Sequence, residues 1–371
     1  MPGSPFDNPF QVTMPVGADD VIDRQEAISQ ICALAREGNN ARVVGPRRYG
    51  KTSVVKQAQR ELARSGEWET VYVDLLGITT LDELTVRIER SYVEALKGPV
   101  ARWFDSLRRT LRPTIGVGGG AIPASGAVDL SGRTQSLVER LALPAQVHRK
   151  TGSRVHVVFD EFQEIDELDV AVDGILRSEI QHHAGEASYV FAGSAIRMME
   201  LMFTDRKRAF YAQTIAVPVP VVPDADLADY VHGRFETTGK SVESAAISAL
   251  LDLVRGHPQR AMVAAHYLWD KTSELAGVEQ WDAAYGRLMR DLDDEMRTVW
   301  IGLSRGDRVT LSNIATGRGP YASGGGGVER SGGAAKASVE NLVGRGLVER
   351  SARRYVVVDP LLERWVWDQR P

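Results

Sequence analysis

The apolar positions of this chain follow two kinds of pattern. Five short runs have the character of strands, and residues 154–159 are almost continuously apolar, as in a strand buried on both faces of a parallel sheet. Between the runs, apolar residues recur every three or four positions, as in helices with one buried face. This alternation predicts an α/β domain with a parallel sheet. The five runs are residues 41–44, 70–75, 154–159, 188–193 and 214–219.

After residue 223 the pattern is helical. Three helices are followed by one long helix, then by a short helix, a glycine-rich loop, another helix and a two-stranded hairpin. The order of the last elements is typical of a winged helix-turn-helix. The predicted ranges are 224–237, 242–254, 259–274, 281–303, 309–315, 334–345, 347–349 and 355–358.

These patterns predict four parts. One of them, an α/β core, contains a further predicted helix at residues 134–150. It also contains a glycine-rich stretch, 114–132, which fits either a short hairpin or a flexible insertion. The parts are an extended N-terminal arm (1–18), an α/β core (19–222), a helical lid (223–280) and a winged-helix domain (281–371).

Composition adds limits to this picture. The chain has 371 residues, of which 43% are hydrophobic and 25% charged, so it can bury more than one core. Its single cysteine, Cys32, excludes an internal disulfide and fits a reducing compartment. The N-terminus lacks the basic and apolar stretches of a secretion signal, and no apolar run is long enough to span a bilayer. We therefore expect a cytoplasmic protein without a membrane partner.

A glycine-rich loop joins the first predicted strand to a helix. It matches G-x-x-x-x-G-K-[ST], in which two glycines let backbone N–H groups surround a phosphate chain at the start of a helix. The lysine then places a cation on the phosphates, and the threonine hydroxyl is a Mg²⁺ ligand. A chance glycine-rich turn is the alternative, which so many specified positions disfavour. The predicted nucleotide-binding residues are Gly45, Pro46, Arg47, Arg48, Tyr49, Gly50, Lys51, Thr52 and Ser53.

Two carboxylates, Asp160 and Glu161, end the apolar run 154–159. A strand that delivers two acids at its C-terminal end is the Walker B arrangement, in which the first acid holds Mg²⁺ and the second deprotonates the attacking water. A solvated acidic turn is the alternative. Ser194 ends the neighbouring run and is placed to contact the γ-phosphate or the water, or to cap the next helix. We expect Lys51, Glu161 and Ser194 to be catalytic, and Thr52 and Asp160 to bind the metal.

With these motifs in place, the chain resembles the archaeal-type P-loop ATPases, which are close to the STAND and AAA+ ATPases and related in plan to origin-recognition initiators. The resemblance rests on residues 21–24 (VIDR), the phosphate loop, residues 157–165 (VVFDEFQEI), 191–194 (FAGS) and 256–260 (GHPQR). It implies a RecA-like parallel sheet of order 5-1-4-3-2, a helical lid and a C-terminal winged helix. ATP and Mg²⁺ are the implied cofactors.

The resemblance also implies roles for further residues. Gln163 would lie near the γ-phosphate, and Arg260 would be a second sensor on the phosphates. The GHP turn would close over the base, although it also fits a plain helix break. The residues implied to border the adenine are Val21, Ile22, Arg24, His257 and Pro258.

One departure from the family concerns an arginine before the fifth strand. The matching position is Gln213, so an arginine finger is lost or has moved to Arg206, Lys207 or Arg208. Hydrolysis is therefore expected to be slow, or to depend on a protein activator or a homo-oligomer.

Three functions fit these observations: a nucleotide-dependent switch that hydrolyses ATP, a DNA-binding transcription or replication regulator whose ATP site controls assembly, and a scaffold with a structural nucleotide. The intact Lys51 and Glu161 disfavour the scaffold.

The distribution of charge along the chain bears on the choice between the ATP-hydrolysing switch and the DNA-binding regulator. Residues 297–358 contain ten basic and four acidic residues, a net charge of +6 in a chain of −4. This asymmetry suits a duplex-DNA surface, although a regulatory latch on the nucleotide domain is nearly as compatible. The candidate DNA-binding residues are Lys336, Ser338, Asn341, Arg353 and Arg354.

Overall fold

The computed structural model describes residues 7–12, 22–111, 130–168, 171–322, 332–351 and 354–369. The chain forms two compact units. The sheet unit consists of Arg24–Gly45 and Lys51–Val219. The helical unit consists of Met1–Asp23, Pro46–Gly50 and Pro220–Pro371. Among the described residues, no helix is long and apolar enough to cross a membrane.

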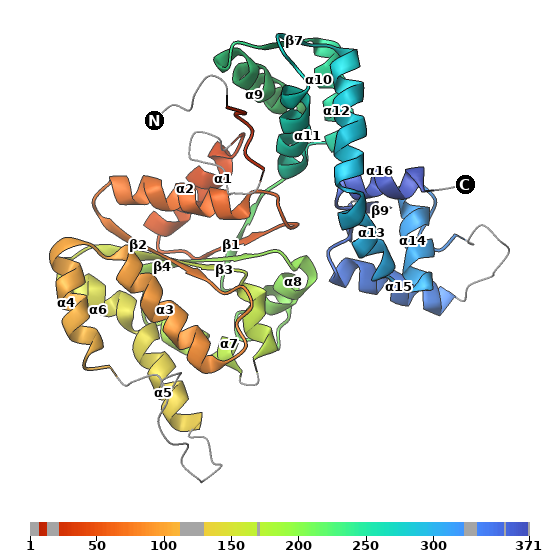
Figure 1. Ribbon diagram of the computed structural model, residues 1–371. Helices are drawn as coiled ribbons and strands as arrows, with labels where there is room; N and C mark the ends of the chain where they lie inside the picture. Colours follow the sequence, from red (N-terminus) through yellow and green to blue (C-terminus); the bar gives the residue numbers. More distant parts are fainter. Residues whose placement is uncertain are drawn as a thin grey trace, which may run out of the picture. The chain divides into compact units, whose positions relative to one another are not determined.

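The sheet unit is built on five parallel strands in the order β2-β3-β4-β1-β5 (Figure 1). This confirms the predicted RecA/AAA+-like α/β fold and the strand order that the resemblance implied. Each residue of β4 is buried, because helices cover both faces of the sheet. The strands are β1 (Ala41–Val44), β2 (Trp68–Asp74), β3 (Arg154–Asp160), β4 (Ala187–Gly193) and β5 (Ile215–Pro218).

Figure 1 shows α1 and α2 on one face of this sheet and α3 and α7 on the other. The single helix predicted at residues 134–150 is wrong, because the chain forms α5 and α6 with a break at Ala142. Pro144 lies in the first turn of α6, where its missing N–H is tolerated. The helices are α1 (Gln25–Arg36), α2 (Lys51–Arg64), α3 (Leu81–Ala95), α4 (Gly98–Arg108), α5 (Leu130–Leu141), α6 (Leu143–Thr151), α7 (Val172–Ile180) and α8 (Ile196–Thr204), with a 3₁₀ turn η2 (Phe162–Glu167).

The helical unit has one continuous apolar core that extends from α9 to α16. The predicted long helix at residues 281–303 is wrong, because it divides at Leu292 into α12 and α13. Three acidic residues in the first turn of α13 favour a new helix start there. The helices are α9 (Asp224–Thr237), α10 (Ser244–Val254), α11 (Pro258–Asp270), α12 (Val278–Asp291), α13 (Asp293–Ile301), α14 (Arg305–Ala315), α15 (Gly332–Gly344) and α16 (Pro360–Asp368).

Two small sheets complete this unit. The antiparallel pair β8 (Val348–Ser351) and β9 (Arg354–Val357) follows α15, as the sequence predicts for the hairpin. A parallel pair, β6 (Ser241–Val242) and β7 (Leu275–Ala276), was not predicted, because two-residue strands carry too little periodicity to be recognised.

A short N-terminal segment packs on α9 and α11. Phe10 is 1% exposed, and its ring centroid lies 5.8 Å from that of Phe235. The side-chain amide of Asn8 donates to the carbonyl of His266 at 3.0 Å. Residues 1–6 and 13–18 of the predicted arm 1–18, and residues 114–129 of the predicted insertion 114–132, lie outside the described residues.

Candidate active site

The glycine-rich loop lies between β1 and α2, as predicted. Arg48 and Gly50 have φ angles of 68° and 86°, in the left-handed region, so the loop turns sharply before the helix. Lys51 and Thr52 form the first turn of α2, and Lys51 is 5% exposed. The backbone N–H groups of this first turn have no partners within the helix, which makes such a terminus suited to an anion.

Asp160 at the end of β3 reaches the start of α2. Its Oδ2 accepts hydrogen bonds from the Thr52 hydroxyl at 2.7 Å and from the Tyr72 hydroxyl at 2.5 Å. Tyr72 comes from the adjacent strand β2, and burial together with the charge of Asp160 raises the pKa of its hydroxyl. Tyr72 therefore stays protonated and holds the carboxylate of Asp160 beside Thr52.

Glu161 follows Asp160 and turns toward β4. Its φ angle is 51°, a left-handed conformation that is uncommon for glutamate. Its Oε2 accepts hydrogen bonds from the Gln163 amide at 2.7 Å, and from the Ser194 hydroxyl at 2.7 Å and backbone N–H at 3.1 Å. No donor among the described residues reaches Oε1, so one carboxylate oxygen is anchored and the other is available.

The ionisation of Glu161 follows from these contacts. Burial raises the pKa of its carboxyl, but hydrogen bonds from Gln163 and Ser194 and the charge of Lys51 outweigh burial. The net pKa lies below the usual value, so Glu161 is an anion at neutral pH.

Gly193 permits the approach of Gln163 to β4. A Cβ atom at this position would lie 2.5 Å from Oε1 of Gln163 and 2.6 Å from the sulfur of Met199. Oε1 of Gln163 is itself buried and has no hydrogen-bond partner in the described part of the chain. A buried acceptor without a donor is costly, which is consistent with a ligand or water that donates to it.

A ring cluster under the site fixes the turn after β3. Phe162 is fully buried, and its ring centroid lies 4.6 Å from that of Phe191 and 5.4 Å from that of Phe210. Because Phe162 is anchored in this way, the chain before it cannot rotate freely. The cluster thereby orients Asp160 and Glu161.

The donor set fits a P-loop magnesium site. Mg²⁺ prefers oxygen ligands and keeps several waters, so it needs few protein ligands. Thr52 and Asp160 supply a hydroxyl and a carboxylate that are already in contact. Among the described residues, no three His, Cys, Asp or Glu side chains converge, so a dedicated cage of such ligands is not found there.

The predicted lid residues lie together in the helical unit. His257 is 3% exposed, caps α11 through Nδ1, and lies 4.9 Å from the ring of Tyr49. Burial lowers the pKa of His257 to about 4, so its ring is neutral at physiological pH. Pro258 is the first residue of α11.

Arg260 has partners that the sequence did not indicate. It is 2% exposed, and its Nε donates to both carboxylate oxygens of Asp359 at 2.9 and 3.0 Å. Its Nη2 also donates to Asp359 and, at 3.3 Å, to Glu295, which pairs with Arg48 at 3.6 Å. The guanidinium is thus engaged by carboxylates of the C-terminal segment.

At the predicted adenine border, Ile22 is half-buried in the helical unit and Arg24 is 5% exposed before α1. Val21 lies outside the described residues.

The three candidates for a displaced arginine finger differ. Arg208 forms ion pairs with Asp166 and Asp173, whereas Arg206 and Lys207 are exposed and have no ion pair among the described residues.

The candidate DNA-binding residues also differ in exposure. Lys336 and Arg354 are exposed. Ser338 is 7% exposed, and Asn341 donates to Asp307 of α14 at 2.9 Å, so Ser338 does not face outward and Asn341 is engaged within the unit. Arg353 lies outside the described residues.

Solved structures with similar folds cover nearly the whole chain. A Walker-type ATPase of Pyrococcus abyssi matches with a TM-score of 0.70 and 16% identity, over 96% of this chain and 99% of that chain. The ORC2 protein of Aeropyrum pernix, in ADPNP–ADP complexes, matches with a TM-score of 0.58 and 14% identity, over 98% and 96%. The Aeropyrum pernix ORC1 protein, in complex with DNA, matches with a TM-score of 0.53 and 16% identity, over 96% of each chain.

At these identities the likeness is one of fold. No model of a known protein family matches the sequence, and no curated protein sequence matches it.

Proposed function

We propose that this chain is a Mg²⁺-dependent ATPase that acts as a nucleotide-controlled switch. The observation that carries the proposal is the convergence of two pairs at one edge of the sheet, Thr52 with Asp160 at 2.7 Å and Ser194 with Glu161 at 2.7 Å. The lysine, hydroxyl, two carboxylates and polar sensor that ATP hydrolysis requires all come from this edge.

Each residue has a separate role in this proposal. Lys51 places a positive charge on the β and γ phosphates, with backbone N–H groups of residues 45 and 47–53 around them. Thr52 and Asp160 hold Mg²⁺, which when bound neutralises charge on the phosphates. Glu161 takes a proton from the attacking water through its available Oε1, while Ser194 keeps Oε2 fixed.

The remaining predicted residues would contact other parts of the nucleotide. Val21, Ile22, Arg24, His257 and Pro258 are proposed to border the adenine. Arg260 is the proposed second sensor, a role that requires release from Asp359. The fold likeness to a protein solved in ADPNP–ADP complexes supports a nucleotide ligand.

The slow hydrolysis expected of a switch is related to the hydrogen bonds that hold Glu161. A base held by three hydrogen bonds on one oxygen is well positioned but restrained, which favours slow intrinsic turnover. We propose that a protein activator or a second copy of the chain accelerates hydrolysis, because Gln213 stands where the resembled family carries an arginine.

Two variants test the ATPase proposal. Lys51→Ala should weaken ATP binding at least about tenfold, because it removes a buried cation from the phosphates. Glu161→Gln keeps the shape of the side chain and should bind ATP as the wild type does, while turnover falls by about 10²-fold or more. Binding is measured by calorimetry with ATP and Mg²⁺, and turnover by phosphate release. Unchanged ATP affinity in Lys51→Ala would contradict the proposed loop function.

A second candidate function is association with duplex DNA through the C-terminal elements. Exposed Lys336 on α15 and Arg354 at the hairpin favour it, together with the net charge of residues 297–358. The order α14, α15, β8, β9 supports a winged-helix arrangement. A protein of similar fold, ORC1, was solved in complex with DNA.

The DNA proposal predicts a change in salt dependence. Arg353→Ala together with Arg354→Ala should lower duplex affinity and reduce the slope of log affinity against log salt by about two, if both arginines touch phosphates. Fluorescence anisotropy at several salt concentrations measures this slope. An unchanged slope, with altered nucleotide exchange, would favour the regulatory latch instead.

A further inference from the structure

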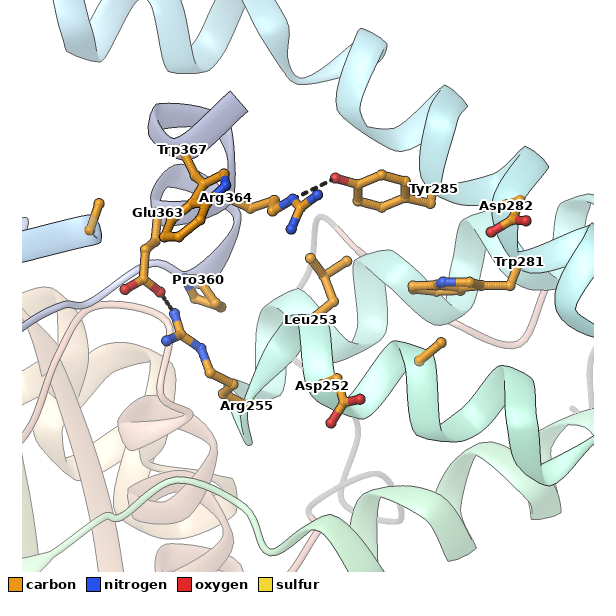
Figure 2. Close-up of a pocket in the computed structure, with 12 residues that line it drawn as sticks. Asp252, Leu253, Arg255, Trp281, Asp282, Tyr285, Pro360, Glu363, Arg364 and Trp367 are labelled. Carbon is orange, nitrogen blue, oxygen red and sulfur yellow. Dashed lines mark hydrogen bonds and ion pairs between the residues drawn. The ribbon is translucent and has the colours of Figure 1, made fainter. Parts of the chain in front are cut away.

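The cavity shown in Figure 2 has an ordinary pairing of charged side chains. It has a volume of about 550 Å³ and lies among α10, α12 and α16 of the helical unit. Arg255 forms an ion pair with Glu363, and Arg364 donates to the hydroxyl of Tyr285 at 3.0 Å, so both arginines of the wall have partners within it. The carboxylate of Asp160 in the sheet unit differs from this pattern, because two hydroxyl groups converge on one of its oxygens.

The hydrogen bonds of Asp160 fill most of its capacity to accept. A carboxylate offers about four lone-pair positions, two on each oxygen. Oδ2 accepts from the hydroxyls of Thr52 at 2.7 Å and Tyr72 at 2.5 Å, and Oδ1 accepts from the backbone N–H of Glu161 at 3.0 Å. Both positions on Oδ2 are therefore filled, and one position is left on Oδ1.

The two hydroxyls that share Oδ2 differ in what else they can do. An ionised carboxylate only accepts, so each hydroxyl donates its single proton to Asp160. Thr52 lies in the first turn of α2, and its oxygen keeps lone pairs for a metal ion. Tyr72 comes from β2, and its ring centroid lies 4.4 Å from the ammonium nitrogen of Lys56, which holds the ring in place. Tyr72 thus fills a position on Asp160 from outside the glycine-rich loop.

We propose that Tyr72 makes this site select Mg²⁺ over Ca²⁺. The inference rests on the ATPase function proposed above, with Thr52 and Asp160 as the residues that hold the metal. Mg²⁺ keeps several waters and takes few carboxylate oxygens, whereas Ca²⁺ takes about six to eight oxygen ligands and often both oxygens of one carboxylate. The single position left on Asp160 suits Mg²⁺. Loss of the Tyr72 hydroxyl frees a position on Oδ2, so that both oxygens become available to the larger ion.

Tyr72→Phe tests this inference on the full chain, because it removes the hydroxyl and keeps the ring beside Lys56. Calorimetry measures the affinity for ADPNP, an ATP analogue that resists hydrolysis, in excess Mg²⁺ and in excess Ca²⁺. Binding in Ca²⁺ should become tighter than in the wild type. The ratio of the affinity in Mg²⁺ to the affinity in Ca²⁺ should fall about tenfold, which is the scale of one hydrogen bond to a charged group.

Tyr189→Phe is the matched control. It removes a hydroxyl from β4, on the other side of β3, where the hydroxyl contacts His183 at 2.5 Å, and it should keep the wild-type ratio. The same fall in this control would show a general effect on the sheet and would overturn the proposal.

Two results with Tyr72→Phe would also overturn it. One is an unchanged ratio, and the other is a ratio that falls only because binding in Mg²⁺ weakens, since the hydroxyl would then support Asp160 without excluding Ca²⁺. The wild type separates these failures from a failure of the ATPase proposal. If the wild type binds no ADPNP in Mg²⁺, the ATPase function is wrong and the selectivity inference falls with it.

Discussion

Glu161 shows how unequal the two oxygens of one carboxylate become in a folded site. Three hydrogen bonds converge on Oε2, from a side chain two residues ahead and from both the backbone and side chain of Ser194. The donors stabilise the anion, and together with the charge of Lys51 they keep the carboxyl pKa low in spite of burial. Glu161 is thus ready to accept a proton, and Oε1 is the oxygen that can do so.

A pH profile follows from this environment. Because the pKa of Glu161 lies below its usual value, the carboxylate stays ionised and turnover should not fall between about pH 8 and pH 5.5 through this residue. Gln163→Met removes one donor, so the pKa of Glu161 should rise and the acid limb of the profile should move to higher pH. Phosphate release measured across this range checks both. An identical acid limb in the variant would show that Gln163 does not set this pKa.

The residues of the site differ in how far the sequence could predict them. The positions of Lys51, Thr52, Asp160 and Glu161 follow from two short motifs on a strand and a helix. Tyr72 was missed, because its contact with Asp160 depends on the register of β2 against β3, over a separation of 88 residues. A tyrosine two residues before the end of a strand next to the acidic one is the signal that could have indicated it.

At the level of elements, the segment between α8 and β5 carries the arginines that could act on a neighbouring site. Arg208 pairs with Asp166 and Asp173, which hold it within its own unit. Arg206 is exposed and has no ion pair among the described residues. The structure therefore ranks Arg206 ahead of Arg208, which sequence spacing could not do.

Arg206→Ala should reduce ATP turnover in the concentration range where turnover per chain rises with protein concentration, and leave it unchanged in dilute protein. Mixing it with Lys51→Ala, whose Arg206 is intact, should restore part of the lost turnover. Arg208→Ala is the control and should lower stability more than it lowers turnover. Equal turnover of Arg206→Ala and wild type at all concentrations would contradict a role in a second subunit.

A second contact between elements joins α11 to the start of α16. Asp359 caps α16, since its Oδ1 accepts from the backbone N–H of Leu361 at 2.9 Å, and the same carboxylate pairs with Arg260. The Asp359 side chain thus caps a helix and forms an ion pair. Substitution by asparagine separates these two roles, because asparagine is an equally good cap but carries no charge.

Asp359→Asn keeps the cap and removes the charge opposite a buried guanidinium. Breaking a buried ion pair from one side is strongly unfavourable, so the helical unit should lose about 3 kcal/mol of stability. Urea unfolding followed by tryptophan fluorescence measures this loss. Glu295→Gln, at a more exposed partner of Arg260, should cost less, and the reverse order would show that Glu295 is the main counter-ion.

Helix boundaries were predicted less well than helix positions. The breaks at Ala142 and Leu292 fall in segments with continuous helical periodicity, because the apolar stripe persists across both breaks. The buried face of α15 was also missed. Its Ser338 was expected to face DNA, but it lies against α14, where hydrogen bonds from Ser304, Asn341 and Ser338 outweigh burial and lower the pKa of Asp307.

For the whole molecule, the two units differ in how the chain builds them. Along the chain, the sheet unit is interrupted by the five residues Pro46–Gly50 of the glycine-rich loop, which belong to the helical unit. The core of the helical unit contains residues from both the N-terminal and the C-terminal part of the chain, since the ring of Phe10 packs against Tyr230 and Phe235. The order of the strands followed from the resemblance, whereas these long-range assignments followed from no local pattern.

The central position of β1 has a consequence for synthesis of the chain. In the described sheet, β1 pairs with β4 and with β5, and the contact between Asn40 and Tyr189 spans 149 residues. On the ribosome, β1, the strand before the glycine-rich loop, is made first but must wait for β4 before it has a strand to pair with. The earliest sheet pairing open to the growing chain is β2 with β3, without the loop. The proposed nucleotide could therefore assist only the last stage of sheet assembly, when β4 and β5 enclose β1.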